Sequence, residues 1–164
     1  MLGLTELGVV HTAISLAAIV AGVLAFVRYK QIRTTDRLGQ TYLVTTFLTA
    51  ATGLGIFEHG GFGPPHVLSI MTLIALAIGA LAAFGKSFGR SSQTVQAVAF
   101  TSTAFFHTIP GFTESLTRLP LGNPVLPSQE APEFQVIYGV LLVLFVIGLV
   151  LQLRWLRGGA GPAG

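Results

Sequence analysis

The sequence predicts an all-α integral membrane protein with five transmembrane helices, the first four forming a bundle and the fifth packed outside it. Two observations predict this class. Hydrophobic residues make up 52% of the 164-residue chain and charged residues only 9%, far below the roughly 25% of soluble domains. Five apolar runs suited to a bilayer core of about 30 Å are separated by polar connections, at residues 7–27, 39–58, 66–84, 93–108 and 134–153.

The first run is expected to remain in the protein as a transmembrane helix. A cleaved signal peptide would begin with a basic segment, but the residues before this run include Glu6 and no Lys or Arg. A basic connection, 28–37, then leads to the second run. This run contains several threonines, and such hydroxyls bond to their own backbone or to a neighbouring helix.

The Gly- and Pro-rich segment 60–65 predicts a tight turn between the second and third runs. Ser91 or Ser92 is expected to cap the fourth helix. The fourth run is the least hydrophobic, with Thr101, Ser102 and Thr103 in succession. We therefore expect it to be the helix most enclosed by protein.

Residues 109–133 are expected to form a long extracytoplasmic loop, because they include five prolines. Loops of this length are usually functional or disordered. The fifth run is almost entirely Leu, Val and Ile, so it is expected to face lipid. The single transmembrane domain thus covers residues 1–157, and residues 158–164 are expected to be a disordered tail.

The charged residues predict the orientation in a bacterial inner membrane or other cell membrane. Eight of nine Lys and Arg fall on the side where the first run ends, and five of six acidic residues fall on the other side. Basic loops stay in the cytoplasm. The amino terminus is therefore expected outside and the carboxyl terminus in the cytoplasm. The same distribution argues against nucleic-acid binding, since the basic residues lie between apolar runs.

The four histidines are the strongest functional signal, because the five-helix topology brings all of them toward the extracytoplasmic side. They come from different helix ends: His11, His59, His66 and His107. Ionisable side chains inside a membrane usually face the interior of a helix bundle and mark a functional site. Cysteine is absent, which excludes disulfides and thiolate metal sites.

Two imidazoles from different helices are the ligands of a bis-histidine b-type haem. Gly53 and Gly55 would leave room beside such a group, and Arg118 would meet its propionates. Ser15, Ser69 and Thr103 are expected to hydrogen-bond to the histidines, since they share helix faces with them. The function expected from these residues is electron transfer through haem b, with a redox partner or a larger membrane complex.

Two alternatives remain open at this stage. The same four histidines fit a zinc or copper site, and Glu58 or Glu114 would then serve as the base of a hydrolytic enzyme. The other alternative is a non-catalytic accessory subunit of a larger membrane complex. In that case the histidines would serve only as hydrogen-bonding groups.

A family resemblance rests on the first half of the chain. The segment Arg37-Leu38-Gly39-Gln40-Thr41-Tyr42, the later Thr52-Gly53-Leu54-Gly55 and a histidine early in the first run resemble an uncharacterised family of small bacterial polytopic membrane proteins. Members often have a histidine just before that arginine, where this chain reads Thr34-Thr35-Asp36. This departure removes a cytoplasmic-side histidine and argues against a second haem on the inner side. The architecture is also similar to that of four-helix b-type cytochromes.

Overall fold

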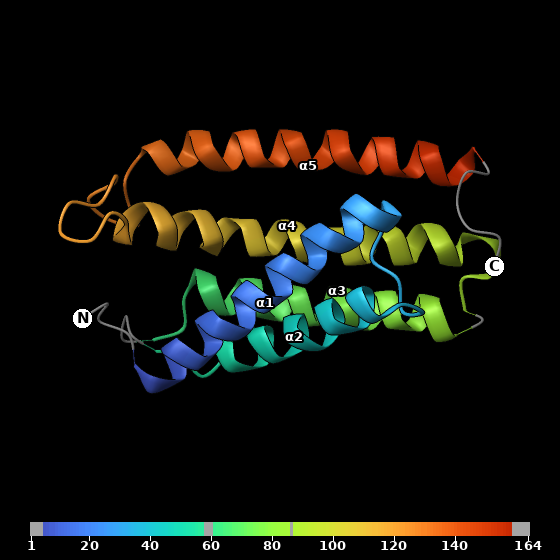
Figure 1. The fold of residues 1–164 in the computed structure, drawn as a ribbon, viewed down its shortest axis with the longest axis horizontal. Coiled ribbons are helices and arrows are strands. Elements are labelled where there is room, and N and C mark those ends of the chain that lie inside the picture. Colours follow the sequence, from blue (N-terminus) through green and yellow to red (C-terminus); the bar gives the residue numbers. More distant parts are fainter. Residues whose placement is uncertain (1–4, 58–60, 86, 159–164) are drawn as a thin grey trace.

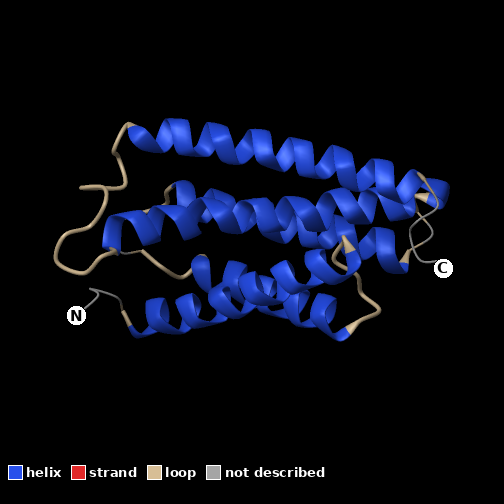
Figure 2. Ribbon diagram, turned by 45° about the horizontal axis from the view of Figure 1, so that its top comes forward, coloured by secondary structure: helices blue, strands red, loops and turns tan. Residues whose placement is uncertain are grey.

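The computed structural model describes residues 5–57, 61–85 and 87–158, and these residues form an all-α structure with no strand. Five long helices run side by side, with their connections gathered at the two ends (Figures 1 and 2). Their bounds are α1 Glu6–Tyr29, α2 Arg37–Gly53, α3 Pro64–Phe84, α4 Ser92–Arg118 and α5 Glu133–Arg157, with a short 3₁₀ turn, η1, at Gly89–Ser91. The all-α prediction is confirmed for the described residues.

Three of the helices, α1, α3 and α5, are long and apolar enough to cross a membrane. Large apolar side chains face outward along them, including Val20 on α1, Leu81 on α3 and Val136 on α5. An outward surface of this kind matches contact with lipid. The other two helices are less apolar for different reasons. The 17-residue α2 is short and rich in threonine, whereas α4 carries polar residues on its buried face.

Local sequence explains where the first helices begin. The Thr5 hydroxyl accepts a hydrogen bond from the Gly8 amide at 3.1 Å and caps α1. The Asp36 carboxylate accepts one from the Gly39 amide at 2.9 Å and caps α2. Such side-chain caps satisfy amides that have no partner within the helix. Asp36 therefore serves as a helix cap.

Glycine allows close packing at two helix pairs. A Cβ added to Gly22 on α1 would lie 2.8 Å from the Tyr42 ring on α2, and one added to Gly79 on α3 would lie 2.2 Å from the Phe100 ring on α4. Both aromatic side chains are almost fully buried. The small residues Ala18, Ala21 and Ala25 extend the α1 face that packs in the same core.

The helices pack in sequence order, α1 on α2, α2 on α3, α3 on α4, and α4 on α5, with a smaller contact between α1 and α4. Gln152 adds a polar link, since it accepts from Thr101 Oγ1 at 2.8 Å and donates to the Lys30 carbonyl at 2.8 Å. These bonds tie α5 to α4 and to the end of α1.

The expected end of the fourth helix at Thr108 is wrong, because α4 continues through Pro110 to Arg118. The expected 109–133 loop is therefore shorter, spanning residues 119–132. Tertiary contacts hold the added turns: the Thr113 and Tyr138 hydroxyls lie 2.6 Å apart, and Leu116 packs against a cluster that includes Phe134.

The second helix also ends earlier than expected, at Gly53 instead of residue 58. The third begins at Pro64, within the expected turn, because proline is well suited to the first helical position. Ser91 occupies the N-cap position of α4, but its side chain makes no capping bond. Of the expected disordered tail, only Gly158 lies within the described residues.

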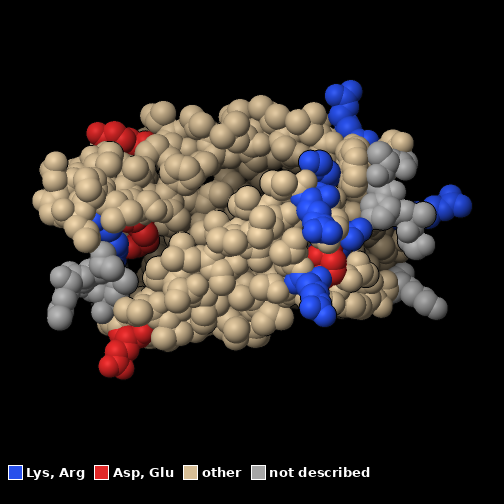
Figure 3. All heavy atoms as spheres, viewed as in Figure 1, with Lys and Arg blue, Asp and Glu red and all other residues tan. Residues whose placement is uncertain are grey.

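Charged residues are segregated between the two ends of the molecule (Figure 3). The basic end is where α1 and α5 finish and α2 and α4 begin. Its described Lys and Arg are Arg28, Lys30, Arg33, Arg37, Arg90, Arg154 and Arg157. The opposite, acidic end carries Glu6, Glu114, Glu130 and Glu133, together with Arg118.

Candidate functional site

Three of the four histidines lie within the described residues. His11 is in the second turn of α1, His66 is in the first turn of α3, and His107 is in α4. Because α4 is longer than expected, His107 lies well inside its helix and not at the helix end. The predicted ligand His59 and its neighbour Glu58 fall outside the described residues.

His107 is almost fully buried, with 8% of its surface exposed. Its Nδ1 lies 3.0 Å from the Thr103 carbonyl oxygen. A carbonyl oxygen only accepts hydrogen bonds, so Nδ1 carries the proton and Nε2 carries a lone pair. This buried Nε2 has no hydrogen-bond partner. An imidazole held through Nδ1 with a free Nε2 is prepared to bind a metal ion.

His11 shows the same pattern of protonation. Its Nδ1 lies 3.0 Å from Thr52 Oγ1. The Thr52 hydroxyl proton is directed to backbone carbonyls of its own helix, with Leu48 O at 2.7 Å and Thr49 O at 3.1 Å. The Thr52 oxygen therefore accepts a hydrogen bond from His11 Nδ1, which leaves the lone pair on His11 Nε2.

His11 and His107 belong to α1 and α4, two helices that contact each other although the residues are nearly a hundred positions apart in the chain. His107 and Glu114 are seven residues apart on α4 and therefore share a helix face.

His66 has the opposite protonation pattern. Its Nδ1 accepts a hydrogen bond from the Gly63 amide at 3.2 Å, as the third residue of a capping box does. The lone pair is therefore on Nδ1 and the proton on Nε2. The rings of Phe57 and Phe62 lie 4.6 Å and 5.2 Å from the His66 ring. His66 is thus a helix cap enclosed by aromatic rings, without a lone pair available on Nε2.

Polar side chains of α2 and α4 lie near the His107 ring. The Tyr42 ring lies 6.1 Å from it, and the Tyr42 hydroxyl is 2.8 Å from Thr103 Oγ1. Further along α2, the buried hydroxyls of Thr46 and Thr49 have no hydrogen-bond partner. Tyr42, Thr46 and Thr49 share a helix face, so this face of α2 offers three hydroxyls to the interior.

Of the two glycines expected beside the haem, Gly53 lies next to a histidine and Gly55 does not. A Cβ added to Gly53 would lie 3.3 Å from His11 Cε1 and 2.6 Å from Ser69 Oγ. A Cβ added to Gly55 would instead lie 3.3 Å from a Leu7 methyl group. Gly53 therefore allows α1 and α3 to approach α2 beside His11.

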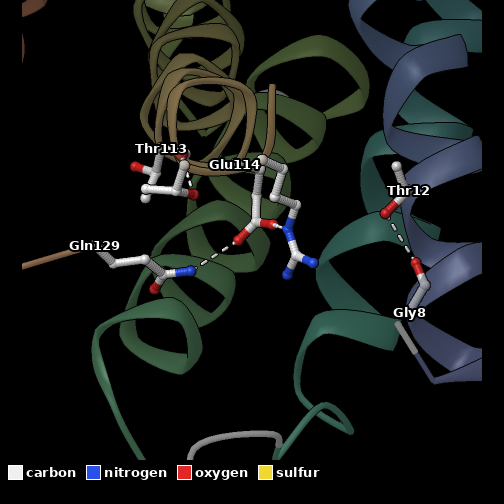
Figure 4. Close-up of polar contacts among 7 residues, drawn as sticks. Gly8, Thr12, Thr113, Glu114 and Gln129 are labelled. Carbon is white, nitrogen blue, oxygen red and sulfur yellow. Dashed lines mark hydrogen bonds and ion pairs between the residues drawn. The ribbon is translucent and has the colours of Figure 1, made fainter. Parts of the chain in front are cut away.

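The two charged residues predicted for the site, Arg118 and Glu114, pair with each other near the end of α4. Glu114 Oε1 also accepts a hydrogen bond from Gln129 Nε2 at 3.0 Å. Figure 4 shows Glu114 directed toward Gln129, with Thr12 of α1 on its other side. Glu114 thus links the 119–132 loop to α4, and both of its carboxylate oxygens are bonded, one to Arg118 and one to Gln129.

A large apolar cleft of about 990 Å³ lies between α1, α4 and α5. It is visible as the hollow in the face shown in Figure 3. Most of its lining is aliphatic or aromatic, and Tyr42 and His107 are among its few polar residues. Phe105 of α4 lines it and stacks on Phe145 of α5, with ring centroids 4.7 Å apart.

The structure also identifies partners that the sequence interpretation missed. Thr52 and not Ser15 holds the His11 ring, because the Ser15 hydroxyl donates to the His11 backbone carbonyl at 2.8 Å. Thr103 holds His107 through its carbonyl and not through its hydroxyl. Tyr42 is a further polar residue near His107 that the histidine pattern did not indicate. Its position four residues before Thr46 does predict that the two side chains share a face of α2.

Within the described part of the chain, no group of three or more His, Asp or Glu side chains is placed to hold a metal ion. No protein-family model matches the chain, and comparisons with curated proteins and with solved structures found no match.

Proposed function

We propose that this chain is a five-span inner-membrane protein that binds b-type haem through His11 and His107 and transfers electrons. The observation that carries the proposal is the protonation pattern shared by these two imidazoles, which lie on helices that contact each other. Each donates from Nδ1 to a fixed acceptor and keeps a lone pair on Nε2. In the axial ligands of a bis-histidine haem, iron binds one nitrogen of each ring while the other donates a hydrogen bond.

A site with two imidazole ligands suits haem better than it suits a zinc or copper ion. The porphyrin supplies four nitrogen ligands, so the protein needs to provide only two. A catalytic zinc site generally takes three protein ligands and an open position. The described part of the chain holds no group of three such residues, and Glu114 is engaged by Arg118 and Gln129.

The five-span arrangement is part of the proposal. The helices α2 and α4 lie alongside the three more apolar helices. The hydroxyls of Thr45, Thr52, Ser102 and Thr108 are bonded to carbonyls of their own helices. Such bonds reduce the penalty for placing a hydroxyl in hydrocarbon. By the positive-inside rule, the basic end would lie in the cytoplasm and the proposed haem in the extracytoplasmic half.

The test is the haem content of purified histidine variants expressed with ample haem precursor. We expect His11→Ala and His107→Ala to lose most of the haem, because each removes an axial ligand. His66→Ala is the matched control and should retain it, since the His66 lone pair is occupied by the Gly63 amide. Full retention in both His11→Ala and His107→Ala, with all variants inserted in the membrane, would refute the ligand assignment.

A further inference from the structure

The cleft between α1, α4 and α5 opens along the side of the molecule. Its walls come from α1 and α5, and α4 forms its floor. Along α4 the lining runs from Thr101 to Leu116, a length of roughly 23 Å at about 1.5 Å per residue. One leaflet of a bilayer core is roughly 15 Å deep, half of about 30 Å, so the cleft has room for an entire acyl chain.

The cleft ends at a group of polar residues near the basic end. Lys30 and Trp155 line it there, beside Gln152. The exposed Lys30 ammonium donates one hydrogen bond, to the Val27 carbonyl at 3.1 Å, and an ammonium group carries three protons. Trp155 supplies an indole N–H, and tryptophan is typical of the level of lipid headgroups.

The positive charge of the residues at this end favours a lipid with a negatively charged headgroup. Among the described residues of the basic end, Asp36 is the only acid. Asp36 is engaged by Arg33 and by the Gly39 amide. Lys30 lines the cleft, and Arg28 and Arg154 at the same end of the molecule add to the positive charge there. Basic residues beside a membrane attract anionic lipids, by about fivefold in affinity for each Lys or Arg.

We propose that the cleft is a binding site for one anionic phospholipid. Its phosphate would lie against Lys30 and the Trp155 indole, and an acyl chain would extend along α4 between α1 and α5. The lipid would separate α1 from α5 and complete the packing of α5. This inference rests on the proposed membrane placement and not on the proposed haem.

The test measures retained lipid by native mass spectrometry. The protein is purified in detergent after incubation with equal amounts of phosphatidylglycerol and phosphatidylcholine. We expect one phosphatidylglycerol per chain, several-fold in excess over phosphatidylcholine. Lys30→Gln should lower this preference by about fivefold. Arg157→Gln, which removes the same charge at the same end but outside the cleft lining, should lower it far less than Lys30→Gln does.

A second pair of variants tests the position of the acyl chain. Gly148 and Gly139 are both on α5, and a Cβ added to either meets open space. Only Gly148 lines the cleft. Gly148→Leu should therefore fill the cleft and abolish retention of both lipids, whereas Gly139→Leu should retain them. If these two variants retain equal amounts of lipid, the proposed site is refuted. The site is also refuted if the protein retains a neutral isoprenoid or a second copy of the chain instead of phosphatidylglycerol.

Membrane placement is checked separately by alkaline extraction of membranes. Protein that stays in the membrane but holds no phosphatidylglycerol would refute the lipid site alone. Release of the protein by alkali would refute the membrane placement on which both proposals depend. Protein that holds phosphatidylglycerol but no haem would refute only the haem proposal.

Discussion

At the scale of single residues, the chemistry of the site depends on which nitrogen of each histidine carries the proton. His11 and His107 donate from Nδ1, whereas His66 accepts at Nδ1. The sequence indicated that histidines converge toward one side, but it gave no means of separating a ligand from a helix cap. That distinction depends on hydrogen-bond partners such as Thr52, which is forty-one residues away from His11.

Thr52→Val should weaken haem binding, because it removes the acceptor that orients His11. Loss of such a supporting partner typically lowers the affinity for the metal by about 10- to 100-fold. Thr45→Val is the matched control on the same helix, since the Thr45 hydroxyl donates only to its own backbone. Haem titration of the purified apoproteins measures the effect. Identical affinities for the two variants would show that Thr52 does not support a haem ligand.

At the scale of helices, close packing by glycine sets the distance between neighbours. Gly79→Ala should destabilise the protein by about 1–3 kcal/mol, because the added methyl group overlaps the buried Phe100 ring. Gly139→Ala should instead be neutral or stabilising by up to about 1 kcal/mol, since alanine favours helix and the site is open. Thermal unfolding in detergent compares the two. A higher unfolding temperature for Gly79→Ala would contradict the α3–α4 packing.

One glutamine at the basic end of α5 contributes to holding this helix in place. Gln152→Leu should destabilise the protein by about 1–3 kcal/mol, because it leaves the Lys30 carbonyl without this donor and Thr101 without its acceptor. Gln135→Leu, at the exposed opposite end of α5, is the control and should have little effect. If both variants unfold at the same temperature, the polar link between α5 and α4 does not contribute to stability.

The presence of the five helices could be predicted from hydropathy, but the residue at which α4 ends could not be predicted. Pro110 lacks an amide proton and commonly ends a helix, so the sequence favoured a loop from that point. The helix continues because Thr113 and Leu116 make contacts with residues beyond the loop, Tyr138 and Phe134 among them. These contacts are tertiary, and a local pattern does not reveal them. For the same reason, the cleft between α1 and α5 could not be predicted.

At the scale of the whole molecule, the segregation of charge predicts orientation. The chain has no cysteine, so single cysteines can be labelled without background. Asn123→Cys, in the loop at the acidic end, should react with an impermeant maleimide on intact cells. Arg157→Cys, at the basic end, should react only after the membrane is opened. The reverse pattern would contradict the orientation and would place the histidine pair toward the cytoplasm.

The central claim is that His11 and His107 together bind one haem. The most direct measurement is the absorption spectrum of the detergent-purified protein, oxidised and then reduced with dithionite. Two imidazole ligands give six-coordinate, low-spin iron, so we expect a Soret band and sharp α and β bands on reduction. A spectrum without these bands, from cells supplied with ample haem precursor, would contradict the claim and leave the histidines as structural groups of a membrane subunit.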